Sequence, residues 1–207
     1  MTEIKTFVSG MVETNSYVVS NEKGDCVIID CEAPCEELCE YIDSNRLRPS
    51  LLLLTHGHFD HMGGAETVKE KYGLKIAIAE NEKDVLEGGK KSGAKFSKDS
   101  MVVVPDIYLK DGDSIEAGDL AFEVMNTPGH TKGGLCYILG DVVFSGDTLF
   151  FEDCGRCDLF SGSFEEMLGS LCRLRDLEGD YKIYPGHGPS TTLEHERKNN
   201  IYMNKEK

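Results

Sequence analysis

The stretch THGHFDH places four metal-ligand side chains, His56, His58, Asp60 and His61, within six residues. It follows the apolar run SLLLLT and leads into a predicted helix. Two histidines separated by one residue project to the same side of an extended chain, and the turn into the helix can aim Asp60 and His61 elsewhere. Imidazole and carboxylate groups together suit Zn²⁺ or Fe²⁺. The stretch therefore predicts a metal site, with Asp60 on an exposed loop.

Three later motifs share one design, a strand end followed by a ligand-type residue in a glycine-bearing loop. NTPGHTKGG contains His130, VVFSGDTLF contains Asp147, and KIYPGHGPS contains His187. Glycine lets the backbone turn sharply and approach closely. Each residue alone would be read as a surface histidine, a helix cap or a turn residue. Together with THGHFDH these motifs hold five of the six histidines, all except His195, and we expect them to converge on a metal centre.

The elements that must position these motifs read as strands followed by helices, twice over. Strands are expected at 4–10, 15–21, 25–30, 50–55 and 74–80, and helices at 34–47 and 61–73. The second half has strands within 106–130, 134–147 and 182–187, and helices within 163–177 and 191–200. The continuous apolar run at 50–55 is typical of a strand buried on both faces. This order predicts an α+β fold of two halves packed sheet to sheet, helices outside, as a single domain over residues 1–207.

Two local patterns give further predictions. Residues 81–101 are polar and rich in Gly and Lys, so we expect a mobile flap with few buried contacts. Thr191 and Glu194 have the spacing of a capping box at the start of the last helix.

The net charge of −15 and the pI near 4.8 argue against a nucleic-acid partner or an anionic membrane surface. The N-terminus has no basic stretch followed by an apolar one, so we expect a cytoplasmic protein with its eight cysteines as reduced thiols. Cys31, Cys35 and Cys39 have helical spacing and are interpreted as small residues on or near a buried helix face. Cys154 and Cys157 have redox-motif spacing, interpreted as a coincidental pair in a substrate loop.

The motif THGHFDH and the later PGH, GD and GH, in this order, resemble the metallo-β-lactamase fold superfamily along nearly the whole chain. The resemblance implies a four-layer αβ/βα sandwich and two divalent metal ions, zinc first, with iron or manganese as alternatives. It assigns His56, His58 and His130 to a first metal site. It assigns Asp60, His61 and His187 to a second site, with Asp147 as the ligand that bridges the two.

Within that superfamily the loops GDTLF, CGR and YPGHGPSTTLEHERKNN resemble glyoxalase II, the hydroxyacylglutathione hydrolases, in their short bacterial type. The similar GRxD loop of that type implies Arg156 and Asp158 as substrate-binding residues. Full-length glyoxalase II enzymes carry a basic C-terminal extension that helps to hold glutathione, whereas this sequence ends soon after HERKNN. We therefore expect a small-molecule thioester substrate with only a weak preference for glutathione.

The implied reaction is hydrolysis by a metal-bound hydroxide, because two neighbouring dications lower the pKa of a shared water toward neutrality. Asp60 would also act catalytically by orienting the hydroxide or accepting its proton. Three alternatives remain open, namely a persulfide dioxygenase-like oxidoreductase with one iron, a lactonase or other esterase, and a non-catalytic metal-binding scaffold. The oligomeric state is left open.

Overall fold

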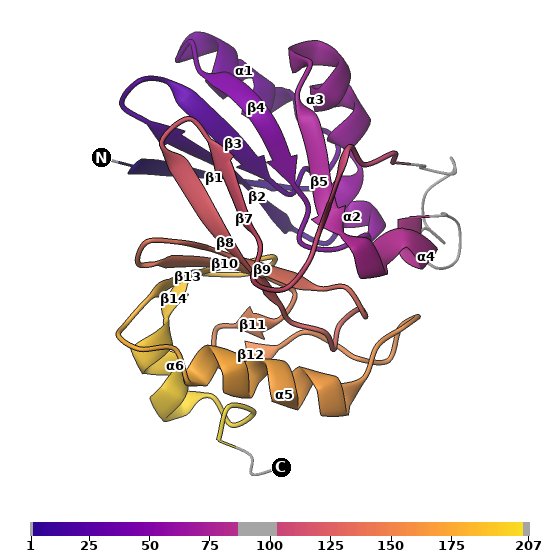
Figure 1. Cartoon of the computed structure of the whole chain (residues 1–207), viewed down its shortest axis with the longest axis vertical. Coiled ribbons are helices and arrows are strands. Elements are labelled where there is room, and N and C mark those ends of the chain that lie inside the picture. The colour runs from indigo at the N-terminus through magenta and orange to yellow at the C-terminus, as the bar shows by residue number, and fades with distance from the viewer. Residues whose placement is uncertain (1, 87–102, 205–207) are drawn as a thin grey trace.

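The computed structural model describes residues 2–86 and 103–204 of the chain. Two six-stranded sheets lie face to face, with helices on their outer sides (Figure 1). The first sheet contains, in hydrogen-bonded order, β1 (Thr2–Ser9), β2 (Thr14–Asn21), β3 (Asp25–Ile29), β4 (Arg48–Leu53), β5 (Lys75–Ala79) and β6 (Ile107–Leu109). Strands β1 to β3 are antiparallel neighbours, and β3 to β6 are parallel.

The second sheet has the order β14 (Thr191–Thr192), β13 (Lys182–Pro185), β10 (Val142–Gly146), β9 (Leu135–Leu139), β8 (Leu120–Asn126) and β7 (Ser114–Ala117). Its pairs are antiparallel except for β10 and β13, which are parallel. A separate small sheet pairs β11 (Leu149–Phe150) with β12 (Asp153–Cys154). The helices are α1 (Glu36–Ser44), α2 (Phe59–Met62), α3 (Ala65–Tyr72), α4 (Lys83–Leu86), α5 (Phe164–Arg175) and α6 (Leu193–Asn199), with a 3₁₀ helix, η1 (Glu80–Glu82).

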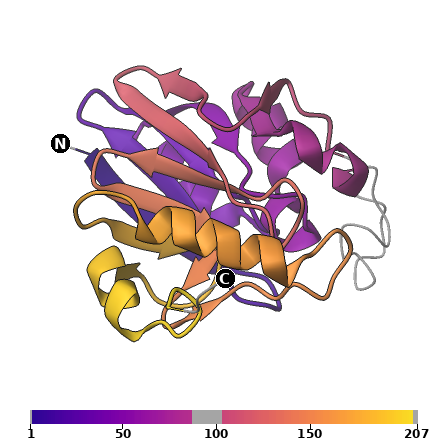
Figure 2. The same ribbon diagram turned by 60° about the horizontal axis from the view of Figure 1, so that its bottom comes forward.

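Three apolar clusters separate the four layers. In β4, Leu51 and Leu53 pack between the two sheets, whereas Leu52 faces the cluster beneath α1 and α3. This alternation explains why SLLLLT is continuously apolar, since both faces of the strand are covered. On the far side of the second sheet, α5 and α6 cover a third cluster that contains Met167 and Leu193 (Figure 2). The structure confirms the predicted α+β sandwich with helices outside.

The prediction of an exposed flap is wrong for residues 81–86. These residues end η1 and form α4, and Glu82, Val85 and Leu86 are buried. Leu86 joins the cluster beneath α3, and the Glu82 carboxylate accepts backbone N–H groups from two site loops. The polar composition of this segment was therefore misleading, because the buried Glu82 carboxylate fixes it to the two loops. Residues 87–101 of the predicted flap lie outside the described residues.

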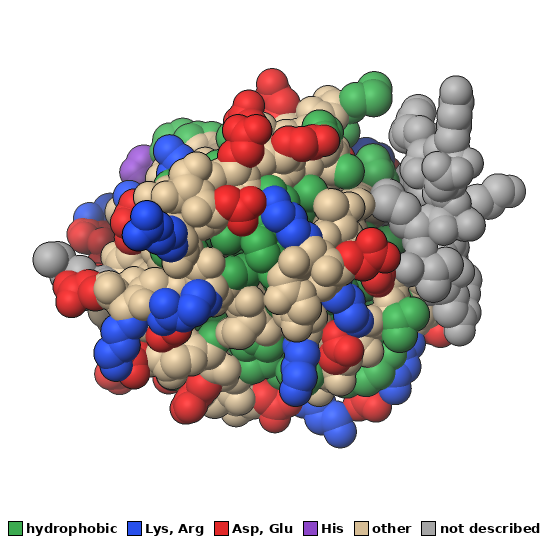
Figure 3. Space-filling view, turned by 90° about the horizontal axis from the view of Figure 1, so that it is seen from above, with side chains coloured by type: hydrophobic (Ala, Val, Ile, Leu, Met, Phe, Trp, Pro, Cys, Tyr) green, Lys and Arg blue, Asp and Glu red, His purple; other side chains and the backbone are tan. Residues whose placement is uncertain are grey.

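The surface carries both signs of charge. On the face seen from above, acidic and basic side chains are interspersed around small apolar areas (Figure 3). Within the described ranges, no helix has the length and apolar character needed to cross a membrane.

Candidate metal centre

The predicted ligand residues meet at one edge of the sandwich, where strands of both sheets end. His56 and His58 follow β4, and α2 carries Asp60 and His61. The second sheet contributes the other three side chains from the loops after β8, β10 and β13, which are His130, Asp147 and His187. The seven residues form three overlapping groups whose ligand atoms lie within 4.8 Å of one another, namely His56, His58 and His130; His56, His61 and Asp147; and Asp60, His61 and His187.

The first group consists of three imidazoles that face one point. His56 Nε2 lies 3.1 Å from His58 Nδ1, and His130 Nε2 lies 2.8 Å from the same atom. Nitrogen ligands of a tetrahedral zinc, with Zn–N bonds of about 2.0–2.1 Å, stand roughly 3.3 Å apart. The spacing of the three nitrogens is therefore close to that of a metal site.

The second group places two imidazoles against carboxylates. His61 Nε2 lies 3.3 Å and His187 Nε2 lies 3.4 Å from Asp60 Oδ2. Asp147 faces both groups, because its Oδ1 lies 3.4 Å from His61 Nε2 and its Oδ2 lies 3.3 Å from His130 Nε2. Asp147 thus occupies the position that a bridging ligand requires.

Hydrogen bonds fix the tautomer of three of these imidazoles. His61 Nδ1 lies 2.7 Å from Asp30 Oδ2, His130 Nδ1 lies 2.7 Å from the Arg156 carbonyl oxygen, and His187 Nδ1 lies 3.0 Å from that of Val12. Carbonyl and carboxylate oxygens can only accept, so in each case Nδ1 carries the proton. Nε2 is therefore the nitrogen that each of these rings can offer to a metal, once any proton on it has been displaced.

The two groups differ in electrostatics. Burial and the neighbouring imidazoles hold the pKa of His56 well below its usual range and lower that of His58 to about 3, so both rings are neutral. Burial also disfavours charge on His187, but Asp147 and Asp60 outweigh it and raise its pKa to about 10. Burial opposes charge on His61 too, and the carboxylates of Asp60, Asp147 and Asp30 raise its pKa. The second group is thus a negative site that favours positive charge.

Two further observations fit divalent ions among these residues. Asp147 Oδ1 is buried and has no hydrogen-bond partner among the described residues. A Cβ atom on Gly186 would lie 2.1 Å from this oxygen and 2.7 Å from His61 Cε1, so any side chain there would fill the space between the ligands. Nitrogen and carboxylate donors in this number suit zinc or iron, and seven ligands exceed what one tetrahedral ion takes.

Asp60 does not lie on an exposed loop as predicted. It lies in α2 and is buried, and Thr14 Oγ1 donates a hydrogen bond to its Oδ2 at 2.9 Å. Thr14 begins β2, far away in sequence, so no local pattern around THGHFDH could predict this hydrogen bond or the burial of Asp60.

Other residues that support the site were missed by the sequence reasoning. Asp30 is buried, has a φ of 53°, and accepts hydrogen bonds from Thr55 N and Thr55 Oγ1 at 2.7 Å each, besides that from His61. Asp30 could have been predicted from the sequence, because it follows the apolar run CVII in the same way that Asp147 follows the run beginning VVF. Glu82 accepts from Gly57 N at 2.9 Å and Gly133 N at 2.8 Å, bracing the loops between the histidines.

The predicted substrate-binding residues form an ion pair at the surface. Arg156 Nε and Nη2 donate to Asp158 Oδ1 and Oδ2 at 2.7 and 2.8 Å, and both side chains are more than half exposed. Arg156 reaches a ligand residue, His130, through its backbone carbonyl. The side chains therefore stand at the periphery of the centre.

Known proteins are similar to this chain over nearly its full length. Residues 10–187 match the Metallo-beta-lactamase superfamily. Hydroxyacylglutathione hydrolase GloC of Haemophilus influenzae is 32% identical over 199 residues, which cover 93% of each chain. The crystal structure of the BLEG-1 B3 metallo-beta-lactamase has a TM-score of 0.92 and 30% identity, covering 98% of this chain and 100% of that one. The structure of TTHA1623 in a di-iron-bound form has a TM-score of 0.85 and 31% identity, covering 96% of this chain and 99% of that one. These similarities confirm the resemblance inferred from the motifs, and the chain belongs to the metallo-beta-lactamase superfamily, most of whose members are metal-dependent hydrolases.

Proposed function

We propose that this protein is a binuclear metallohydrolase that acts on acyl thioesters. The observation that carries the proposal is the set of three overlapping groups of His and Asp ligand atoms. Within them, Asp30 and the carbonyls of Arg156 and Val12 hold Nδ1 protons and so turn three Nε2 atoms toward the other ligands. His56, His58 and His130 would hold one ion, Asp60, His61 and His187 the other, and Asp147 both. When bound, two such ions lower the pKa of a shared water and polarise a carbonyl oxygen.

Asp60 has a second role in this proposal. Its carboxylate is oriented by Thr14 Oγ1, and although burial opposes ionisation, His61 and His187 hold its pKa well below the usual range. An ionised, fixed carboxylate at this position can orient the attacking water by accepting a hydrogen bond from it. A thiolate is a good leaving group that needs little acid assistance, so the chain need not supply a separate acid.

Two comparisons support the choice of thioesters and of two ions. The relative GloC is named a hydroxyacylglutathione hydrolase, and TTHA1623 was crystallised with two irons. We propose zinc as the native metal, because imidazole and carboxylate ligands suit it. Iron and manganese are the alternatives. The glutathione moiety itself is expected to add little binding energy, because the Arg156 guanidinium is already paired with Asp158.

The test is a panel of acyl thioesters hydrolysed by metal-loaded protein, with Asp60→Asn and, as a matched control on the far surface, Asp43→Asn. We expect Asp60→Asn to lower kcat/KM by about a hundredfold or more, roughly 2.7 kcal/mol, and Asp43→Asn to leave it unchanged. Near-normal turnover by Asp60→Asn would remove Asp60 from the mechanism. A protein that holds a single iron and consumes oxygen with a persulfide, but cleaves no thioester, would favour the oxidoreductase alternative instead.

The same panel tests the thiol preference. We expect kcat/KM for a lactoyl-glutathione thioester to exceed that for the same acyl group on a small neutral thiol by less than about a hundredfold. A larger ratio would indicate a dedicated glutathione site.

A further inference from the structure

Three cysteines lie together beside the metal centre but take no part in it. The helical spacing of Cys31, Cys35 and Cys39 suggested one helix face, yet only Cys39 lies within α1. Cys35 is the residue before the helix, and Cys31 lies in the loop after β3. Cys31 and Cys39 are buried, whereas Cys35 is half-buried. The cluster thus consists of one partly exposed residue, Cys35, and two buried ones, Cys31 and Cys39.

The Cys35 thiol interacts with the thiols of both Cys31 and Cys39. The side chains of Cys31 and Cys35 converge on Gly64, where a Cβ atom would lie 2.7 Å from Cys31 Sγ and 3.2 Å from Cys35 Cβ. A disulfide needs Cβ atoms about 3.5–4.5 Å apart. Side chains four residues apart on a helix, the case of Cys35 and Cys39, have Cβ atoms about 5–6 Å apart. Cys31 is therefore the better partner, because the segment from Cys31 to Cys35 is not helical.

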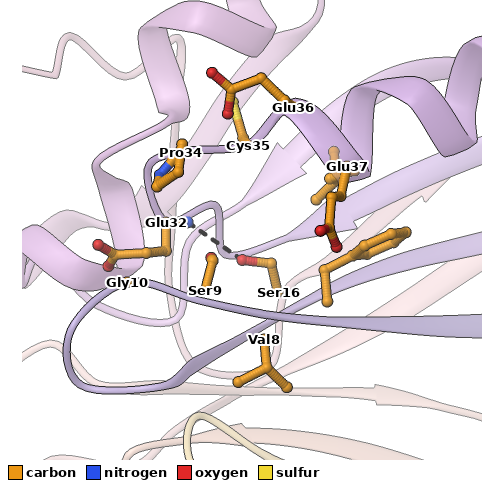
Figure 4. Close-up of a pocket in the computed structure, with 11 residues that line it drawn as sticks. Val8, Ser9, Gly10, Ser16, Glu32, Pro34, Cys35, Glu36 and Glu37 are labelled. Carbon is orange, nitrogen blue, oxygen red and sulfur yellow. Dashed lines mark hydrogen bonds between the residues drawn. The ribbon is translucent and has the colours of Figure 1, made fainter.

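Cys35 lies at a cavity. It lines a cavity of about 370 Å³ between the start of α1 and the end of β1, together with Ser9, Pro34 and the acidic residues Glu36 and Glu37 (Figure 4). This volume lies within the range of small-molecule sites. The two exposed glutamates place negative charge at the cavity, which disfavours anionic molecules and favours neutral or cationic ones.

The same position activates the Cys35 thiol. Its hydrogen bond with Cys31 lowers its pKa to about 7, although burial and the neighbouring Glu36 act in the opposite direction. The same contact and burial raise the pKa of Cys31, so Cys35 is the thiol that ionises first. The N–H groups of the first turn of α1 also favour a negative charge at the residue that precedes the helix. A thiol with a pKa near the ambient pH is an effective nucleophile in disulfide exchange.

We propose that Cys35 and Cys31 form a redox-active dithiol that reduces small neutral or cationic disulfides. The Cys35 thiolate attacks one sulfur of the substrate RSSR, whose S–S bond breaks and releases RS⁻, and a mixed disulfide forms. Cys31 gives up its thiol proton and attacks the Cys35 sulfur, which breaks the mixed disulfide and releases the second RS⁻. Two protons from the protein thiols leave with the two RSH molecules, so one substrate disulfide is reduced and one protein disulfide is formed.

The test uses the full chain loaded with zinc, treated with cystamine, hydroxyethyl disulfide or oxidised glutathione, which are cationic, neutral and anionic. Thiol titration and mass spectrometry after non-reducing Glu-C digestion follow the products. Cleavage after Glu32 and Glu36 puts Cys31, Cys35 and Cys39 on three different peptides, so the digest identifies the pair.

We expect the loss of two thiols and a Cys31–Cys35 link, formed about tenfold or more faster with cystamine than with oxidised glutathione. Cys31→Ser and Cys31→Ala should stop at the mixed disulfide on Cys35, and Cys35→Ser should abolish the fast reaction. Cys172→Ser, which alters a remote thiol, should behave as the unaltered protein. If either Cys31 variant misfolds, the product map of the unaltered protein still decides the pairing.

Three results would overturn the proposal. One is a stable mixed disulfide on Cys35 of the unaltered protein with no internal link. Another is a link from Cys35 to Cys39 in place of Cys31. The third is a Cys35 that reacts no faster than Cys172, or as fast with oxidised glutathione as with cystamine.

Discussion

At the level of single residues, the metal centre depends on atoms that fix where protons sit. Asp30, the Arg156 carbonyl and the Val12 carbonyl each hold an Nδ1 proton and so direct an Nε2 lone pair inward. Such partners orient ligands and tune their basicity, and their loss commonly costs metal affinity by about 10–100-fold. Asp30 is the only one of the three that acts through its side chain, so it can be tested by substitution.

Asp30→Asn should weaken the ion held by Asp60, His61 and His187. If the amide oxygen keeps the hydrogen bond from Thr55 N, the amide NH₂ faces His61 Nδ1, the proton moves to Nε2, and the lone pair is lost to the site. We expect metal titration calorimetry to show one of two affinities lowered by about 10–100-fold. Asp43→Asn is the control, and equal affinities in Asp30→Asn and the unaltered protein would contradict the proposed role of Asp30.

Arg156 and Asp158 should have opposite effects on charged substrates. Exposed ion pairs contribute about 0.2–1 kcal/mol, so the effects are small. Arg156→Ala should raise KM for acidic thioesters by up to about fivefold and leave KM for neutral ones unchanged. Asp158→Ala frees the guanidinium and should lower KM for the same acidic substrates. Initial-rate measurements on one acidic and one neutral thioester decide this, and effects of equal size on both would rule out a charge contact.

At the level of elements, strand ends deliver the ligands and loops must be braced to hold them. The sequence was sufficient to predict the ligand-bearing strand ends, because apolar runs ending in His or Asp beside glycine are visible locally, and β4, β10 and β13 lie where the patterns placed them.

Contacts between distant segments could not be predicted. Glu82 lies in a polar segment that resembles a flap, and the cap of α6 is Thr192, whose side chain accepts from His195 N, rather than Thr191, whose hydroxyl donates to Glu196. The predicted helix 61–73 is two helices separated by Gly63 and Gly64.

Glu82→Ala tests the bracing of these loops. It leaves the N–H groups of Gly57 and Gly133 without their carboxylate acceptors, at a cost of about 1–3 kcal/mol for each that stays buried and unpaired. We expect a lower free energy of unfolding in urea and weaker metal binding by the group of His56, His58 and His130. Glu80→Ala, in the same segment but with its side chain 44% exposed, is the control. A variant as stable as that control would show that the Glu82 carboxylate does not hold the loops.

At the level of the whole molecule, the candidate centre joins the two halves of the sandwich. His56, His58, Asp60 and His61 come from the first half, and the other ligands from the second. Direct contacts also cross between the halves near this edge, since Tyr17 Oη of β2 donates to the Pro185 carbonyl at 2.5 Å and Asn15 N donates to that of Gly186 at 2.7 Å. Ions held by both halves would oppose their separation.

Metal removal should therefore destabilise the folded chain. A ligand at a thousand times its Kd adds about 4 kcal/mol, so chelation should lower Tm by about 8–16 °C. His187 keeps its proton up to a pKa of about 10 in the metal-free protein, and a protonated imidazole cannot bind metal. Metal binding must displace this proton, which costs less free energy as the pH rises toward 10, so the Tm difference between loaded and chelated protein should grow from pH 6 to pH 8. Calorimetry at several pH values checks both statements, and a Tm unaffected by chelation would contradict them.

The number of ions per chain tests the binuclear centre most directly. We expect native mass spectrometry with elemental analysis, after purification without chelators and supplementation with Zn²⁺ or Fe²⁺, to find two tightly bound ions per chain. His187→Ala should retain one, because His56, His58 and His130 remain intact. A chain that never binds more than one ion, in the unaltered protein and under either supplement, would contradict the binuclear site and with it the proposed hydrolysis.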